Sequence, residues 1–260
     1  MNLLFIFNNL KNMIYRTIII FEYGLNRKFK IEGLKKDFNG ISFCIITNGK
    51  RKEKTLKLIK SIKRQKTNKK IEIILCGETS NFLHMKNIIL INAKYLADKG
   101  YLGALRNKAA INSKYEFIIF CDDDIIFPLD FIKNLILFTK FNSWNILGTR
   151  ILLPDGSRYW DRNTIFPHKL VEYSANIDEF NLYQTGGFLI LRKGVFDKVK
   201  WNNKIPIYNK DNNSLNEDID YSLKLYKNGY RLSFDKNNLV WHWDDNVVEF
   251  NEVCVTKEFL

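Results

Sequence analysis

The 260-residue sequence contains only four cysteines, and none of them forms a Cys-x-x-Cys pair. Cys44, Cys76 and Cys121 lie in or beside apolar runs typical of strands, which indicates small, reduced core residues. The spacing gives no support to a disulfide framework. A reducing compartment is therefore expected.

Long apolar runs are also absent. The best candidate for a membrane span, residues 14–25, is too short and is interrupted by Arg16 and Glu22. The first ten residues are apolar but lack a basic segment and a small-residue cleavage site. These absences favour a cytoplasmic protein without a spanning helix.

Acidic residues are outnumbered by basic ones, 28 to 41, which gives a formal net charge of +13. Such an excess favours anionic partners, including nucleotides and the surface of an anionic membrane. The lysines do not alternate with aromatic residues as in an RNA-binding signature, so no nucleic-acid partner is expected. A peripheral contact with a membrane stays open.

No internal repeat or low-complexity linker interrupts the chain, and apolar runs alternate with helical spacing in its first half. The runs predict buried strands at 41–47, 71–75, 87–92 and 117–121. Helices are predicted near 56–62, 102–113 and 129–139. This alternation predicts an α/β fold with a mostly parallel sheet, which binds ligands outside the carboxyl ends of its strands.

The second half is less regular. Short strands are predicted at 145–152, 188–192, 231–235 and 239–243, and a helix at 217–227, with Gly229 just beyond its end. Residues 157–183 carry many aromatic and turn-forming residues, and we predict a loop there.

Three adjacent aspartates, Asp122 to Asp124, follow the buried run FIIFC. Their mutual repulsion beside a buried strand requires a compensating cation. In an extended segment Asp122 and Asp124 point to the same side, where their oxygens suit Mg²⁺ or Mn²⁺. A solvated acidic loop, or a cap for the following helix, is the alternative from the residues alone.

Four segments in order give the chain a family resemblance: ISFCIITNGKR, GALRNKAA, FIIFCDDD followed by PLDF, and NEDIDYSLKLYKNGY. Together they resemble a family 2 glycosyltransferase of the inverting type over about four fifths of the chain. The resemblance implies the GT-A fold of nucleotide-diphospho-sugar transferases, a Rossmann-like mixed sheet flanked by helices. It places this single domain at residues 41–245, between an N-terminal extension (1–40) and a C-terminal tail (246–260).

The resemblance also implies a metal site. Asp122 and Asp124 match the first and third positions of the family's DxD motif, which holds Mn²⁺ or Mg²⁺ against the donor diphosphate. His242, in the segment VWHW, matches a late histidine that can complete the ligand set. From the residues alone, a histidine among aromatics is as readily explained as a core group.

For the nucleotide-sugar donor, the resemblance implies contacts from Thr47 and Asn48 to the base and from Asp123 to the ribose. Arg106 matches the arginine of the family's A-R-N segment and is expected at the base or the diphosphate. Where the family often carries acidic base contacts, this chain has Cys76-Gly77-Glu78, and Glu78 is the candidate substitute.

On the acceptor side, the Glu217-Asp218 pair matches the family's E-D pair. Asp218 is implied as the general base and Glu217 as an acceptor ligand, although both acids also suit a helix N-terminus. Gly186 and Gly187 allow close approach of backbone to a sugar. Trp160 is the aromatic candidate for stacking on the acceptor.

The resulting prediction is metal-dependent transfer of a sugar from a nucleotide sugar, UDP-linked by preference, to a glycan or lipid-linked hydroxyl. Two other classes stay open. A sugar-nucleotidyltransferase normally has a glycine-rich loop after the first strand, where this chain has only Gly49 before Lys50-Arg51. A non-catalytic nucleotide-sugar-binding protein would keep the fold without turnover.

Overall fold

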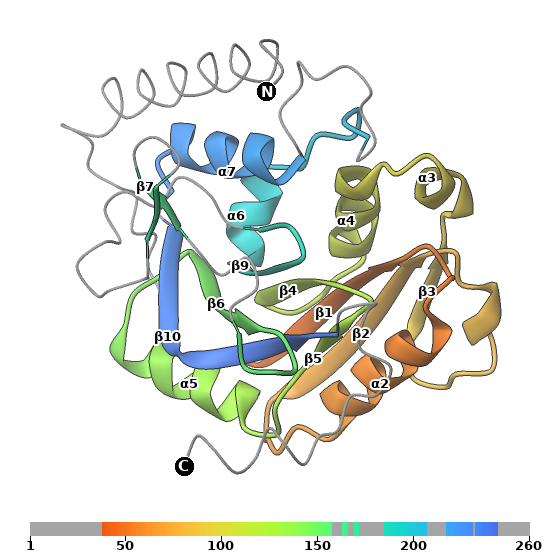
Figure 1. Ribbon diagram of the computed structural model, residues 1–260, viewed down its shortest axis with the longest axis horizontal. Helices are drawn as coiled ribbons and strands as arrows, with labels where there is room; N and C mark the ends of the chain where they lie inside the picture. The colour runs from red at the N-terminus through yellow and green to blue at the C-terminus, as the bar shows by residue number, and fades with distance from the viewer. Residues whose placement is uncertain are drawn as a thin grey trace.

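An eight-stranded sheet forms the centre of the computed structural model, which describes residues 38–157, 163–165, 169–171, 185–206, 217–230 and 232–243 (Figure 1). The strand order is β3-β2-β1-β4-β9-β6-β10-β5. The strands are β1 (Gly40–Thr47), β2 (Lys70–Gly77), β3 (Ile89–Asn92), β4 (Phe117–Asp122), β5 (Ile125–Ile126), β6 (Ile146–Leu152), β9 (Phe188–Arg192) and β10 (Leu232–His242). The helices and strands flanking this mixed sheet confirm the predicted α/β class and single domain.

Strand direction decides which chain segments meet at one edge of the sheet. β1 runs parallel to β2 and β4, and β6 runs parallel to β10. β9 lies between β4 and β6 and is antiparallel to both. The carboxyl ends of β1, β4 and β10 therefore share one edge with the start of β9.

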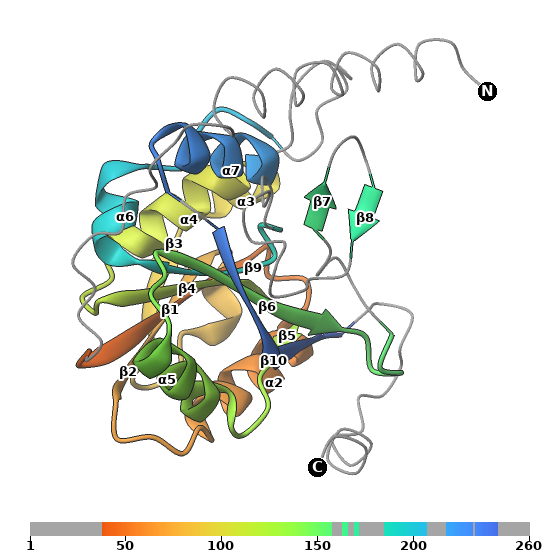
Figure 2. The same ribbon diagram turned by 90° about the vertical axis from the view of Figure 1, so that its left-hand side faces the viewer.

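Helices cover both faces of the sheet (Figures 1 and 2). One face packs against α2 (Lys52–Lys63) and α5 (Phe131–Phe141). The other packs against α4 (Leu102–Ile111), α6 (Lys193–Lys198) and α7 (Glu217–Lys227), and the short α3 (Lys94–Asp98) lies beside α4. Alternate residues of β1 divide between these layers: Phe43 and Ile45 belong to the first core, Cys44 and Ile46 to the second. Burial on both faces explains why β1 is a continuous apolar run.

The three cysteines within the described residues are buried and unpaired with one another, which confirms their assignment as core residues. Burial raises the pKa of the Cys76 thiol to about 11, so it stays protonated at neutral pH. Cys254 lies outside the described residues. No helix in the described ranges is long and apolar enough to cross a membrane.

The prediction of two strands at 231–235 and 239–243 is wrong. A single strand, β10, runs from Leu232 to His242 beside β6, and its register shifts between Asp235 and Leu239. The intervening polar residues interrupt the apolar pattern without ending the strand, because the segments on both sides of them pair with β6. Within the bulge, Asp235 Oδ1 accepts a hydrogen bond from the Asn237 amide. The loop predicted at 157–183 contains the antiparallel pair β7 (Asn163–Ile165) and β8 (Lys169–Val171); its other residues from 158 onwards lie outside the described residues.

The buried Asp235 makes the stability of this bulge depend on pH. Burial raises its pKa to about 6, partly offset by the amides of Asn237 and Asn238. A carboxyl whose pKa is raised by folding contributes stability below its unfolded pKa, and this contribution is lost as the pH rises through about 6. We expect Asp235→Asn to gain about 2 kcal/mol relative to wild type between pH 4 and pH 7. Urea unfolding at both pH values measures this, and parallel pH curves for the two proteins would contradict it.

Candidate active site

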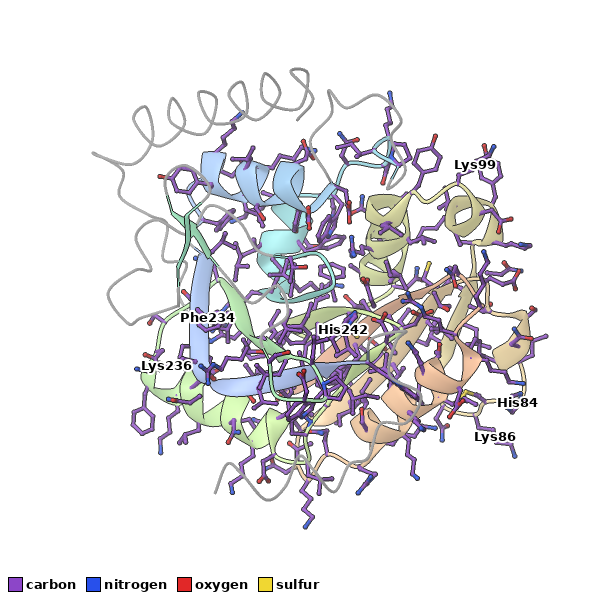
Figure 3. All side chains as sticks on the ribbon, viewed as in Figure 1. His84, Lys86, Lys99, Phe234, Lys236 and His242 are labelled. Atoms are coloured by element: carbon purple, nitrogen blue, oxygen red, sulfur yellow. The ribbon has the colours of Figure 1, made fainter. Side chains whose placement is uncertain are left out.

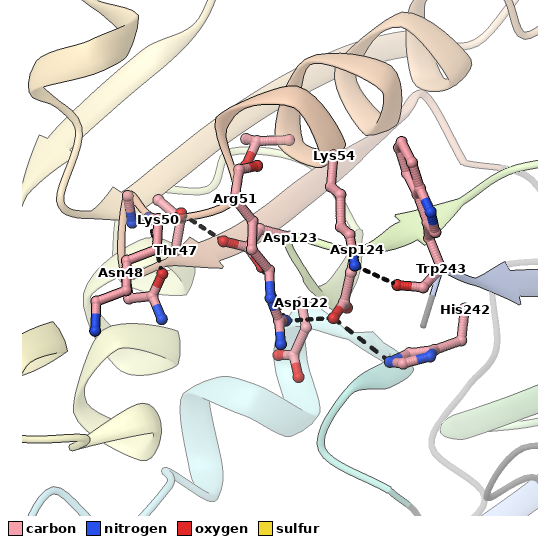
Figure 4. Close-up of polar contacts among 12 residues, drawn as sticks. Thr47, Asn48, Lys50, Arg51, Lys54, Asp122, Asp123, Asp124, His242 and Trp243 are labelled. Atoms are coloured by element: carbon pink, nitrogen blue, oxygen red, sulfur yellow. Dashed lines mark hydrogen bonds and ion pairs between the residues drawn. The ribbon is translucent and has the colours of Figure 1, made fainter. Parts of the chain in front are cut away.

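The aspartate cluster lies where β4 ends, and its second and third members are held by neighbouring elements (Figure 4). Thr47 Oγ1, at the end of β1, donates to Asp123 Oδ2 at 2.6 Å. Asp124 is the last residue of the turn before β5, and β5 pairs with the end of β10 so that His242 lies opposite Ile125. The His242 Nε2 atom is consequently 3.4 Å from Asp124 Oδ2. The topology thus brings Thr47 to Asp123 and His242 to Asp124.

Burial dominates the electrostatics of this cluster. It raises the pKa of Asp123 to about 7, against the lowering effect of the Thr47 hydrogen bond. It also raises the pKa of Asp122 to about 6, opposed by Arg106 and reinforced by Asp124 and Glu217. Two carboxyl groups that resist ionisation side by side favour a bound cation.

Arg106 lies under the site rather than at its surface, with 1% of its side chain exposed. Its Nη2 donates to Asp122 Oδ1 at 3.1 Å and its Nη1 to Glu217 Oε1 at 3.0 Å, while its guanidinium stacks on the Trp201 ring. Burial alone would lower the pKa of Arg106, but Asp122 and Glu217 together raise it above its ordinary value. One buried cation therefore joins β4 to the first residue of α7.

The turn before β9 crosses directly over this ion pair. A Cβ atom on Gly186 would lie 3.0 Å from Arg106 Nη1, and one on Gly187 would lie 3.3 Å from Asp122 Oδ2. The Gly187 carbonyl accepts a hydrogen bond from the Asp122 amide at 3.0 Å. Glycine at both positions lets the backbone approach the carboxylate and the guanidinium closely.

Asp218 lies on the other side of that turn. The Gly186 amide points at Asp218 Oδ2 over 3.4 Å, a long contact. Asp218 is half-buried, whereas Glu217 is buried and its carboxylate is engaged by Arg106. Two residues of turn backbone thus separate the predicted general base from Asp122.

Asn48 and Glu78 contact residues other than the aspartates. Asn48 is exposed, and its Oδ1 accepts from the Lys50 amide. Glu78 is half-buried at the end of β2, beside the Gly49 turn, where it accepts from the Ser80 amide and pairs with Lys94. Trp160 lies outside the described residues. The contacts of Asn48, Glu78 and Trp160 with substrates stay predictions.

The ends of β1 and β2 approach each other closely beside the site. Gly77, the last residue of β2, has a φ of 135° and faces the end of β1. A Cβ atom there would lie 1.9 Å from the Thr47 carbonyl oxygen. Because Thr47 holds Asp123, Gly77 allows the hydroxyl to reach that carboxylate.

The residues fit a divalent cation by their chemistry and by one unsatisfied atom. Across the described ranges, no group of three or more histidine, cysteine, aspartate or glutamate side chains is gathered closely enough to hold a metal. The aspartates instead form ion pairs with different arginines: Asp122 pairs with Arg106, and Asp124 pairs with Arg51. However, Asp124 Oδ1 is buried and no described donor satisfies it, an expensive state for a carboxylate oxygen unless a cation completes it.

Arg51 is a site residue that the sequence interpretation missed. It precedes α2, and its Nη1 contacts Asp124 Oδ2 and lies 3.5 Å from Asp123 Oδ1 (Figure 4). One turn later, Lys54 donates to the carbonyl of Trp243, whose amide donates to the Asp124 carbonyl. The sequence feature that could have indicated this role is the run of basic residues, Lys50 to Lys52, shortly after the first strand, because ligands were predicted to bind at the carboxyl ends of the strands.

The position of His242 separates it from the other described histidine. Figure 3 shows His242 near the middle of the molecule, while His84 lies at its periphery. His168 lies outside the described residues. Of the two described histidines, His242 alone contacts the aspartate cluster.

The sequence of residues 42–200, more than half of the chain, matches the family described as Glycosyl transferase family 2. The chain belongs to this family. The match contains most of β1, the aspartates, Arg106 and the Gly186-Gly187 turn, and it ends before α7. Asp218 and His242 thus lie beyond the matched part of this family 2 member. A comparison with curated proteins finds no match.

Solved structures share the fold at low sequence identity. S. aureus TarS 1–349 in complex with UDP-GlcNAc is 16% identical, with a TM-score of 0.58, covering 81% of this chain and 60% of that chain. GalNAc-T7 with UDP, GalNAc and Mn²⁺ is 14% identical, with a TM-score of 0.61, covering 81% of this chain and 45% of that chain. This family 2 chain therefore has the GT-A fold and spans 60% or less of either neighbour.

Proposed function

We propose that this protein is an inverting glycosyltransferase that moves a sugar from a nucleotide sugar, UDP-linked by preference, to a hydroxyl of a glycan or lipid-linked acceptor. Family membership supports glycosyl transfer, and the neighbours solved with UDP or UDP-GlcNAc support the donor class. One observation carries the mechanism. The Gly186-Gly187 turn contacts both carboxylates: the Gly186 amide points at Asp218 Oδ2, and Gly187 lies against Asp122, so this short turn links the proposed diphosphate side to the proposed base.

Asp122, Asp124 and His242 are the residues that would hold Mn²⁺ or Mg²⁺. The ion supplies charge neutralisation for the leaving nucleoside diphosphate. The hydrogen bond from Thr47 restrains the Asp123 carboxylate, which supports the proposed contact of Asp123 with the donor ribose. Asn48 and Arg51, at the same edge, complete a polar rim to which the base and diphosphate can bind.

The acceptor hydroxyl oxygen attacks the anomeric carbon of the donor sugar. Its proton passes to the Asp218 carboxylate, and the bond from the anomeric carbon to the diphosphate oxygen breaks with its electron pair leaving on the nucleotide. Attack opposite the leaving group inverts the anomeric configuration. Arg106 acts through its neighbours: by holding Asp122 and Glu217 it fixes the distance between the leaving-group side and the base.

Nucleotide release from a panel of sugar nucleotides, with and without Mn²⁺, tests the proposed function. We expect UDP release in the presence of an acceptor extract, suppressed by a chelator, and a loss of about 10²-fold in turnover for Asp124→Asn. Asp98→Asn, an exposed carboxylate on α3, is the matched control and should retain wild-type turnover. Pyrophosphate release from nucleoside triphosphates would indicate nucleotidyl transfer instead. Nucleotide-sugar binding without turnover would indicate a binding protein.

A further inference from the structure

The contacts of Arg51 with the aspartates themselves have no role in the chemistry above. The Arg51 guanidinium contacts Asp124 Oδ2, the same oxygen that faces His242 at 3.4 Å. The Asp123 and Asp124 side chains are 6% and 4% exposed, whereas that of Arg51 is 36% exposed. The guanidinium thus reaches in from solvent and neutralises carboxylates that are otherwise buried.

The backbone of Arg51 is fixed, whereas its side chain is partly exposed. The Arg51 carbonyl accepts hydrogen bonds from both the amide and the hydroxyl of Thr55, each at 2.9 Å, which anchors the start of α2. These bonds do not involve the guanidinium. A change of the Arg51 side-chain rotamer therefore leaves these bonds at the start of the helix intact.

We infer that Arg51 is a resident counter-cation that competes with the divalent metal for Asp124 and couples metal binding to nucleotide binding. This inference rests on the proposed metal-dependent function. A metal ion on the unsatisfied Asp124 Oδ1 would share one carboxylate with the guanidinium on Oδ2, and the repulsion between the two cations favours displacement of the guanidinium. The displaced Arg51 then needs an anionic partner, and a nucleoside diphosphate at the same edge of the sheet supplies one.

In this arrangement the site has a low affinity for metal without nucleotide and a higher affinity for metal once nucleotide is bound. Without nucleotide, metal binding costs the Arg51 ion pairs; with nucleotide, new contacts to phosphate replace them. The coupling is reciprocal, so metal also strengthens nucleotide binding. Direct contact between the metal and the diphosphate contributes one part of this coupling free energy. Arg51 contributes the other part, which a substitution of Arg51 removes.

Calorimetric titration of the full chain with MnCl₂, with and without UDP, tests the inference independently of turnover. Arg51→Gln is expected to bind Mn²⁺ alone about tenfold more tightly than wild type, the size of one charge-assisted hydrogen bond. The enhancement of Mn²⁺ affinity by UDP should shrink by a similar factor. Lys52→Gln is the matched control, because it removes the same charge from an exposed position at the same helix start, and its affinity should stay within about twofold of wild type.

Two results would overturn the inference. One is an Arg51→Gln protein that binds Mn²⁺ alone no more tightly than wild type, as a purely structural or phosphate-binding arginine would give. The other is equal tightening in Lys52→Gln, which would indicate general charge. Arg51→Ala serves if Arg51→Gln does not fold. If wild type binds no Mn²⁺ even with UDP, the proposed metal dependence itself fails; if it does bind and Arg51→Gln is unchanged, only the inference fails.

Discussion

Replacing Asp218 with asparagine is expected to lower kcat by about 10²- to 10⁴-fold, the usual contribution of a general base. The asparagine side chain has nearly the same shape, and its amide oxygen can keep the contact with the Gly186 amide. It cannot take up the acceptor proton at neutral pH. Because Asp218 is separated from the aspartate cluster by the Gly186-Gly187 turn, donor binding should persist.

Steady-state rates of UDP release at saturating donor measure this effect, and calorimetry with UDP and Mn²⁺ measures the retained binding. Asp220→Asn is a suitable control on the same helix, because Asp220 pairs with Lys224 at 2.8 Å and makes no described contact with the Gly186-Gly187 turn. A kcat within fivefold of wild type for Asp218→Asn would remove Asp218 as the base. A joint loss of kcat and UDP binding would instead assign it to the donor site.

The sheet could be predicted from the sequence because its strands are buried on both faces. The run from Ile41 to Thr47 becomes β1 without exception, and Phe117 to Cys121 becomes β4 with the aspartates at its carboxyl end. Parallel order then placed the ends of β1 and β4 side by side. This was enough to predict the ligand edge, though not the contacts within it.

The contacts that define the site could not be predicted, because they join residues far apart in the chain. Arg106 meets Glu217 across 111 positions, and Arg51 meets Asp124 across 73. No local pattern marks which basic residue will be buried against which acid. The prediction of two strands in place of β10 failed for the opposite reason. Four polar residues at the bulge gave a local signal of a strand break, but pairing with β6 on both sides keeps the strand continuous.

The buried charge of Arg106 gives the largest expected effect on stability. Arg106→Met keeps a side chain of similar length but leaves Asp122 and Glu217 without their common cation, and removes the stack on Trp201. Removing one partner of a buried ion pair typically costs about 3–5 kcal/mol. That is a large share of the roughly 5–15 kcal/mol by which domains are stable. Guanidinium unfolding of wild type and Arg106→Met at pH 7.5 measures this loss.

The pH dependence distinguishes loss of the cation from simple loss of packing. In wild type, burial already raises the pKa of Asp122 to about 6, against the lowering effect of Arg106. Without Arg106 that pKa rises further, so the folded state binds its proton more strongly than the unfolded state over a wider range. Stability is then retained at low pH and lost as the pH rises through the raised pKa, so the deficit of Arg106→Met should shrink between pH 7.5 and pH 5. A deficit that does not change over this range, or one below about 1 kcal/mol, would mean that packing alone explains the burial of Arg106.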